Sequence, residues 1–86
     1  MTVPEVVVYL TQWCPYCASA KALLESKKVR FEEIDIVASP ERRKEMIRRS
    51  GRHTVPQIFI GERHIGGCDD LLELNAAGDL DPLLRG

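Results

Sequence analysis

The fold is decided by residues 6–17, VVVYLTQWCPYC, which lead from a strand directly into a helix that opens with two cysteines. The run Glu5–Leu10 is rich in β-branched and aromatic residues and predicts a strand that is buried on both faces. From Pro15 onward the apolar residues fall at helical spacing, and proline is favoured at the first position of a helix. We therefore expect Cys14 and Cys17 to lie at a strand-to-helix junction.

The remainder of the chain alternates strands and helices. Further strands are predicted at Phe31–Ile36, Gln57–Ile60 and Arg63–Ile65, with a hairpin turn at Gly61-Glu62. A second helix is predicted from Ser39-Pro40-Glu41 to near Gly51, and a last one after Gly66-Gly67, with Leu71, Leu72 and Leu74 on its apolar side and Gly78 as its cap. A long crossover makes the first two strands parallel. This order predicts an α/β thioredoxin-like fold, in which helices flank a four-stranded mixed sheet.

The composition is that of one small globular domain spanning residues 1–86. The longest apolar run, Val6–Leu10, is too short for a signal sequence or a membrane span, and Met1–Glu5 carry no basic leader. We therefore expect a cytoplasmic protein with no membrane partner. Three cysteines are an odd number for a secreted disulfide framework, which favours a chemical use for them.

The charge of the chain is nearly balanced, with a formal net charge of −1. This value argues against a surface that binds nucleic acid or other polyanions. Six basic residues are nevertheless concentrated in one short stretch: Arg42, Arg43, Lys44, Arg48, Arg49 and Arg52. We interpret them as a solvated helix face that is balanced by Glu41 and Glu45.

The spacing of Cys14 and Cys17 is suited to thiol chemistry. Backbone N–H groups at the start of a helix have no acceptor within the helix, so they can stabilise a thiolate at Cys14, as does the helix dipole. The thiolate is the nucleophile in disulfide exchange. Cys17 lies one turn further on and should be less exposed, which suits a resolving thiol that attacks a mixed disulfide formed at Cys14.

A metal site is the alternative interpretation of the two cysteines. One pair supplies two ligands, whereas a closed tetrahedral site needs four. Cys68 with His53 or His64 could complete the set, but no second pair with ligand spacing is present. The sequence therefore favours redox chemistry, with no metal.

Three segments together resemble the signature segments of the glutaredoxin family. They are Cys14-Pro15-Tyr16-Cys17, Thr54-Val55-Pro56-Gln57 and Gly66-Gly67-Cys68-Asp69-Asp70-Leu71. Their order and spacing span essentially the whole chain and are most similar to the small bacterial dithiol members. The resemblance implies a glutathione-dependent thiol-disulfide oxidoreductase that uses glutathione as reductant and requires no metal.

The resemblance also implies where glutathione binds. It implies that Pro56 follows a cis peptide bond and that the Val55 backbone faces Cys14, pairing with glutathione as an added strand would. Thr54 belongs to the same segment, and Tyr16 is expected to line the entrance and contact the ligand. Without the resemblance, Pro56 would be interpreted as an ordinary trans proline at the start of a strand.

The start of the last helix is the expected site for the γ-glutamyl end of glutathione. Free N–H groups at Gly67, Cys68 and Asp69 suit its carboxylate, and the Asp69 side chain suits its ammonium group. The simpler interpretation is that Asp69 and Asp70 only cap the helix. Cys68 is interpreted as a small buried residue rather than a third redox thiol.

The glycine carboxylate of glutathione has a less obvious partner. Family members commonly place a lysine three residues before the nucleophile, where this chain has Thr11. Arg43 matches a second basic position of the family and could hold the carboxylate bidentately, with Lys21 as a weaker substitute. Trp13 has two open interpretations: an exposed aromatic that meets substrate proteins, or a residue packed on the first helix.

The expected activity is reduction of glutathione mixed disulfides and protein disulfides through Cys14 and Cys17. Expected partners are glutathionylated or disulfide-containing proteins, among which the family can serve ribonucleotide reductase, and we expect a monomer. Two rivals remain open. One is a redoxin of the same fold reduced by a flavoprotein reductase, which Thr11 encourages but Asp69 and Arg43 oppose. The other is an iron-sulfur carrier that uses Cys14 with glutathione across a dimer.

Overall fold

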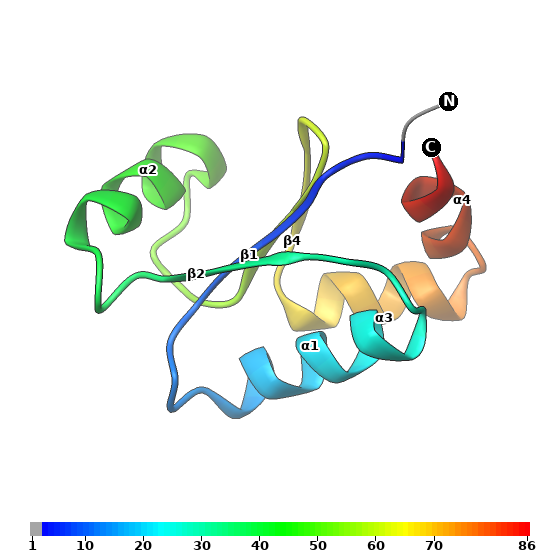
Figure 1. The fold of residues 1–86 in the computed structure, drawn as a ribbon, viewed down its shortest axis with the longest axis horizontal. Coiled ribbons are helices and arrows are strands. Elements are labelled where there is room, and N and C mark those ends of the chain that lie inside the picture. Colours follow the sequence, from blue (N-terminus) through cyan, green and yellow to red (C-terminus); the bar gives the residue numbers. More distant parts are fainter. Residues whose placement is uncertain (1–2) are drawn as a thin grey trace.

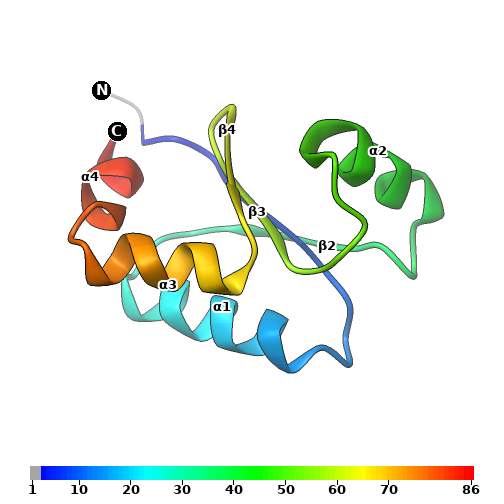
Figure 2. The same cartoon turned by 180° about the vertical axis from the view of Figure 1, so that it is seen from behind.

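The computed structural model describes residues 3–86. Strands and helices follow one another in the order β1 (Val6–Leu10), α1 (Pro15–Ser26), β2 (Glu32–Asp35), α2 (Pro40–Ser50), β3 (Gln57–Ile60), β4 (Arg63–Gly66), α3 (Cys68–Ala76) and α4 (Leu80–Arg85). The sheet lies in the middle, with α1, α3 and α4 on one side and α2 on the other (Figure 1). Figure 2 shows the same division from behind.

The sheet is mixed, as predicted. Its strand order is β2-β1-β3-β4, with β2 parallel to β1 and both other pairings antiparallel. The two-residue turn Gly61-Glu62 joins β3 to β4, so the hairpin prediction is confirmed. The α1 crossover returns the chain to the same end of the sheet, which allows β1 and β2 to be parallel. The thioredoxin-like fold is therefore confirmed.

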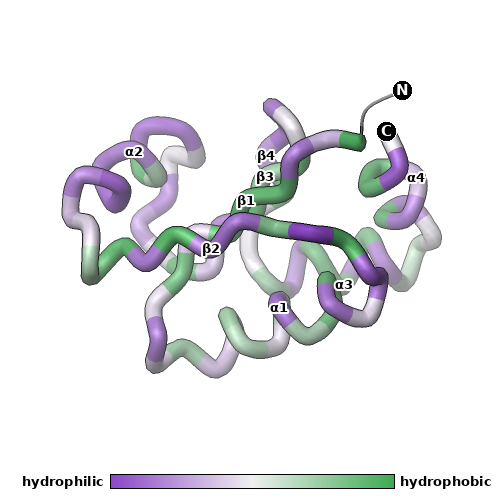
Figure 3. Tube along the Cα trace, in the orientation of Figure 1, coloured by the Kyte–Doolittle hydropathy of each residue, from purple (hydrophilic) through white to green (hydrophobic). Residues whose placement is uncertain are grey.

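The central strand β1 explains why the fold has two cores. All five of its residues are buried, and successive side chains of a strand point to opposite faces. Val6, Val8 and Leu10 pack under α1, α3 and α4, whereas Val7 and Tyr9 pack under α2. Figure 3 shows this apolar centre against a mostly hydrophilic α2. This agrees with the interpretation of α2 as a solvated face except at Arg49, which donates to the Tyr9 hydroxyl at 2.8 Å and lies over the Phe59 ring.

The predicted helices are present with small differences at their ends. Pro15 and Pro40 lie in the first turns of α1 and α2, and Gly51 ends α2 in the left-handed conformation at φ 73°. The prediction for Leu72 was wrong, since this side chain of α3 is 46% exposed. In residues 3–86, no helix is long and apolar enough to span a bilayer.

The short helix α4 was not predicted. Its buried residues Leu80 and Leu84 extend the core beneath α1 and α3. Lys27 at the end of α1 pairs with Asp81 of α4 at 2.9 Å. The helix thus closes the end of the molecule that is remote from the loop between β1 and α1 (Figure 1).

Candidate functional site

Cys14 lies at the N-terminal cap of α1, where the chain leaves β1. Its backbone is extended, at φ −97° and ψ 113°, and Pro15 begins the helix. The Cys14 Sγ accepts a hydrogen bond from the Cys17 backbone N–H at 3.2 Å. The predicted use of the free N–H groups at the helix start is therefore present in the structure.

Cys17 differs from Cys14 in being buried. It is 2% exposed and belongs to the core that includes Ala20 and Leu24. Burial, followed by hydrogen bonding with Cys14, raises the pKa of the Cys17 thiol to about 12. Both cysteines are free thiols, so the structure is that of the reduced pair. Cys17 is thus a neutral thiol placed behind a more accessible one.

The loop before β3 faces the two cysteines. The Val55-Pro56 peptide bond is cis, as the family resemblance implied. The Val55 backbone oxygen lies 3.8 Å from the Cys14 Sγ and accepts its thiol hydrogen. Main-chain atoms of this loop therefore lie beside the nucleophile candidate.

A buried amide holds this loop on the sheet. Gln57 is fully buried, and its amide nitrogen donates to the Thr54 backbone oxygen at 3.0 Å and to Thr54 Oγ1 at 3.2 Å. Its Oε1 lies 2.7 Å from His64 Nε2 on β4. Since Gln57 Oε1 can only accept a hydrogen bond, the proton of His64 must lie on its Nε2. Gln57 and His64 were not among the predicted site residues.

The start of α3 forms the opposite wall of the site. The Asp70 carboxylate accepts a hydrogen bond from the Gly67 backbone N–H at 2.9 Å and pairs with Arg52 Nη1 at 3.2 Å. Both contacts, with the Gly67 N–H first, lower the pKa of Asp70 below its usual range. Gly66 has φ 118°, and a Cβ there would overlap the Asp70 carboxylate. The capping interpretation thus holds for Asp70, while Asp69 is exposed.

A surface cavity of about 230 Å³ lies between these walls. Its lining contains seven of the residues predicted to bind glutathione, namely Tyr16, Thr54, Val55, Pro56, Gly67, Cys68 and Asp69, together with Arg52 and Asp70. The two other predicted residues, Thr11 and Arg43, do not line it. The structure therefore gathers three distant segments of sequence at one site and leaves two candidates outside.

Arg52 was missed by the sequence analysis, which grouped it with the solvated basic residues. Asp70 was considered only as a cap. A signal existed, because Arg52 precedes Thr54 by two residues and Asp70 follows Gly67 by three. Their approach, however, depends on the packing of α3 against the loop before β3.

The structure also shows the surroundings of Trp13, Cys68 and Lys21. Trp13 is 91% exposed, so it does not pack on α1. Cys68 is buried in the core beneath α1, and burial raises the pKa of its thiol, as expected of a small buried residue. Lys21 is engaged by Glu33 at 3.1 Å. No cluster of three or more His, Cys, Asp or Glu side chains within residues 3–86 could hold a metal ion.

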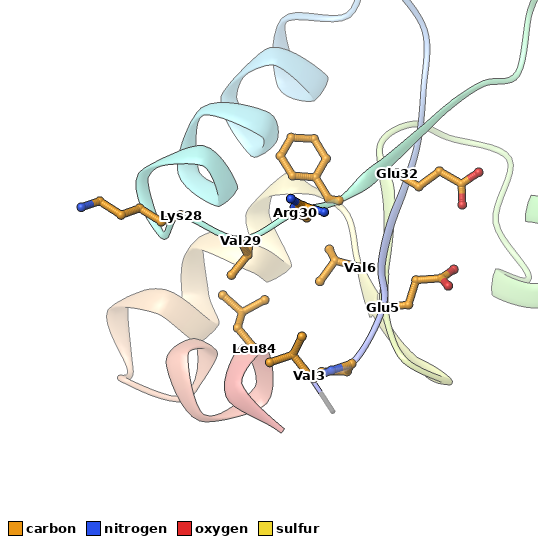
Figure 4. A pocket seen from close by; sticks show the side chains of 10 residues that line it. Val3, Glu5, Val6, Lys28, Val29, Arg30, Glu32 and Leu84 are labelled. Atoms are coloured by element: carbon orange, nitrogen blue, oxygen red, sulfur yellow. The ribbon is translucent and has the colours of Figure 1, made fainter. Parts of the chain in front are cut away.

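A larger cavity, of about 600 Å³, lies at the far end of the molecule (Figure 4). Val3, Val29 and Leu84 point into it, whereas Lys28 and Glu32 point outward. None of the three cysteines lines it. Cys14 and Cys17 do not line the smaller cavity either, but the Cys14 Sγ lies 3.8 Å from the backbone oxygen of Val55, which does. We therefore place the chemistry beside the smaller cavity.

This chain is similar to known proteins over most of its length. Residues 6–65 match the family model named Glutaredoxin. Glutaredoxin 3 of Escherichia coli strain K12 is 60% identical over 81 residues, covering 94% of this chain and 98% of the relative. The solution structure of glutaredoxin from Brucella melitensis superposes with a TM-score of 0.86 at 55% identity, covering 99% of this chain and 92% of the other.

A solved complex is also similar to this structure. The buckwheat glutaredoxin-glutathione complex superposes with a TM-score of 0.87 at 32% identity, covering 94% of this chain and 76% of that one. In that relative the fold binds glutathione. The relatives cover nearly the whole chain, whereas the family-model match ends at residue 65, before the start of α3.

Proposed function

Because this chain belongs to the glutaredoxin family, and so is a glutathione-dependent thiol-disulfide oxidoreductase, we propose that Cys14 is its nucleophile and Cys17 its resolving thiol. One observation carries the assignment. The Cys17 N–H donates to the Cys14 Sγ at 3.2 Å, while the Cys17 thiol itself is buried. A substrate disulfide can therefore reach Cys14 first, and Cys17 can act only from within.

Glutathione is proposed to occupy the cavity between the loop before β3 and the start of α3. The Val55 backbone would pair with the tripeptide as an added strand does. The N–H groups of Cys68 and Asp69 would bind the γ-glutamyl carboxylate, with the Asp69 carboxylate near the ammonium group. The Gly67 N–H, which was expected to be free, already donates to the Asp70 carboxylate at 2.9 Å. The buckwheat relative, whose complex contains glutathione, supports glutathione as the ligand.

The glycine end of glutathione is proposed to extend toward Thr11 and Arg43, outside the cavity. Arg43 is exposed on α2 and takes part in none of the ion pairs found within residues 3–86. Its guanidinium is therefore available for a carboxylate, which it can bind with two parallel hydrogen bonds. Thr11 would offer a hydroxyl rather than a charge.

Reduction of a glutathionylated protein needs only one of the two cysteines. The Cys14 thiolate attacks the glutathione sulfur, a bond forms between these sulfurs, and the protein sulfur leaves and takes a proton. A second glutathione thiolate then attacks the glutathione sulfur on Cys14. This step releases glutathione disulfide and restores the Cys14 thiolate. One free glutathione is consumed, and its sulfur leaves bonded to the glutathione sulfur that came from the substrate.

Reduction of a protein disulfide uses both cysteines. Cys14 attacks one protein sulfur and forms a mixed disulfide, and Cys17 then attacks the Cys14 sulfur. The second protein thiol is released, and a Cys14-Cys17 disulfide remains. Two glutathione molecules reduce this disulfide and are oxidised to glutathione disulfide.

The test is steady-state turnover of a glutathione mixed disulfide and of a protein disulfide, coupled to glutathione reductase and NADPH. Cys14→Ser should abolish both activities. Cys17→Ser should retain the first and lose the second. Loss of both activities in Cys17→Ser would contradict the division of roles, and no turnover by the intact protein would contradict the proposal as a whole.

The partner and the location are also proposed. We propose that the disulfide of ribonucleotide reductase is among the protein substrates, which glutathione-dependent reduction of that purified enzyme by this protein would test. We propose a cytoplasmic location, because a glutathione-dependent enzyme needs a pool of reduced glutathione and that compartment keeps thiols reduced. Fractionation of the cell with an antibody to the chain tests it.

A further inference from the structure

Two exposed aromatic side chains flank the proposed nucleophile. Trp13 precedes Cys14 and is 91% exposed, and Tyr16 is 64% exposed. Within residues 3–86 the only other large apolar side chains with high exposure are Val3, Val37 and Leu72. Exposed tryptophan is unusual because its indole is large and apolar, and it is enriched where proteins bind one another.

The two aromatics differ in what would cover them. Tyr16 lines the cavity proposed for glutathione, whereas Trp13 does not. Bound glutathione therefore accounts for the exposure of Tyr16 and leaves the indole of Trp13 uncovered. The substrate has a second half, the protein whose sulfur leaves when Cys14 attacks, and it too must pass close to Cys14.

The residues just before Trp13 are uncharged. Thr11 carries no charge, and the Gln12 amide donates to the Asp35 carboxylate at 3.1 Å. That carboxylate also accepts the backbone N–H groups of Val37 and Ala38, at 2.9 and 3.1 Å, so it keeps its negative charge while being hydrogen bonded within the chain. What Trp13 itself offers a partner is therefore an apolar surface.

We propose that Trp13 is a docking residue for the protein half of a glutathione mixed disulfide, in particular for an apolar side chain next to the modified cysteine. This inference rests on the proposed function, since it assumes that the Cys14 sulfur attacks the glutathione sulfur. It names the substrate class that this enzyme prefers: glutathionylated cysteines in apolar surroundings. Small mixed disulfides lack this half of the contact.

The first experiment compares substrates of different size. Wild type, Trp13→Ala and Trp13→Phe are assayed with the mixed disulfide of glutathione and 2-mercaptoethanol, and with a glutathionylated peptide that has leucine on both sides of cysteine. Trp13→Ala should raise KM for the peptide about tenfold, as loss of an aromatic anchor does, with less than a twofold change for the small substrate. Trp13→Phe should recover most of the loss.

The matched control is Val3→Ala. Val3 is 72% exposed and lines the cavity at the opposite end of the molecule (Figure 4). Its loss should leave both substrates unaffected. An unchanged KM for the peptide in Trp13→Ala would overturn the inference, as would an equal loss with both substrates. No turnover of the small substrate by wild type would instead refute the proposed function.

Fluorescence supplies a readout that does not depend on turnover. Trp13 is the only tryptophan of the chain, so the emission reports on this surface alone. In the unreactive Cys14→Ser variant, the glutathionylated leucine peptide should shift the emission to shorter wavelength, because the indole is removed from water. Glutathione disulfide should not. An unshifted spectrum at saturating peptide would overturn the inference.

Discussion

The buried side chain of Gln57 holds Thr54 in place, with its amide nitrogen 3.0 Å from the Thr54 backbone oxygen. The other end of the amide meets His64 at 2.7 Å. One residue thus connects β3, β4 and the loop that faces Cys14. Since a buried amide without partners is costly, the loop and the sheet constrain each other.

We expect Gln57→Leu to weaken glutathione binding as well as stability. The substitution leaves the Thr54 oxygen and His64 Nε2 without partners, which should cost about 2 kcal/mol of unfolding free energy. A less constrained loop should raise KM for glutathione about tenfold, with a smaller change in kcat. Urea unfolding and the coupled assay measure the two effects separately.

Ser26→Ala is the control for this substitution. Its hydroxyl donates to the Leu23 backbone oxygen at 2.6 Å, but on the exposed end of α1. Its loss should cost no more than about 0.5 kcal/mol and leave KM unchanged. A normal KM for glutathione in Gln57→Leu would show that the amide supports the fold and not the site.

His64 should make the stability of the protein fall as pH falls below 7. Burial, followed by the positive charge of Arg52, lowers the pKa of His64 below its ordinary value of 6.5. In the window between that ordinary value and the lower pKa of the folded protein, the unfolded chain binds a proton and the folded protein does not, so stability falls as pH falls toward the folded pKa. The Asp70 carboxylate, which opposes this shift, remains ionised throughout the window because its own pKa is lowered.

The measurement is urea unfolding at pH 7, 6 and 5 for wild type and His64→Gln. Glutamine supplies an uncharged donor that does not titrate. The variant should lose less stability than wild type over this range, although it is less stable at pH 7. Parallel pH profiles for the two proteins would contradict the role given to His64.

Asp70→Ala should destabilise the start of α3 by about 1 kcal/mol at pH 7, since it removes a helix cap. The pKa of Asp70 is lowered, so its stabilising effect is present above the ordinary carboxyl pKa and is lost as pH falls through the folded value. The difference from wild type should therefore shrink in acid. Unfolding curves at pH 7 and pH 3 test both statements.

Asp81→Ala is the matched control, because Asp81 also pairs with a cation, Lys27 at 2.9 Å, but on exposed α4. Exposed ion pairs contribute little, so we expect a loss below about 0.5 kcal/mol. Equal losses in Asp70→Ala and Asp81→Ala would mean that the hydrogen bond to Gly67 adds nothing.

The sequence predicted the parts of the fold that rest on local patterns. The β-branched run of β1 and the proline at the start of α1 fix the strand-to-helix junction without help from distant residues. Helix α4 was missed because six residues with Pro82 inside are too short for helical periodicity to be visible. Leu80 and Leu84 hold α4 in place by packing in the hydrophobic core. This packing depends on residues distant in sequence, so no local pattern indicates it.

The site residues were likewise predicted only where a local sequence pattern marks them. The motif residues were found because each segment carries its own signal, such as cysteine spacing or a glycine pair before a helix. Arg52 lies next to such a segment and Gln57 within one, but their contacts depend on the folded chain. Arg52 lines the cavity where it pairs with Asp70, which is distant in sequence. Gln57 supports the site because its side chain, on β3, donates a hydrogen bond to the Thr54 backbone oxygen.

The resolving step should become faster with pH over the whole range from 6 to 9. Burial is the main cause that raises the pKa of Cys17 to about 12 in the reduced protein, and it persists when Cys14 is in a mixed disulfide. Only the thiolate attacks, and well below the pKa its fraction grows tenfold per pH unit. When Cys14 is in a mixed disulfide, its thiol no longer contributes to the raised pKa of Cys17, but this contribution is smaller than that of burial. The plot of log rate against pH therefore moves along the pH axis and keeps its slope.

An aromatic disulfide reagent that releases a coloured thiolate makes this step visible. The first equivalent is released when Cys14 is modified, and the second when Cys17 closes the disulfide. The rate of the second release should rise with a slope of about one in log rate against pH, and Cys17→Ser should release one equivalent only. Cys68→Ser should behave as wild type, because Cys68 takes no part in the proposed chemistry. A plateau below pH 8 would mean that Cys17 ionises more easily in the mixed disulfide than its burial allows, and that another group takes its proton.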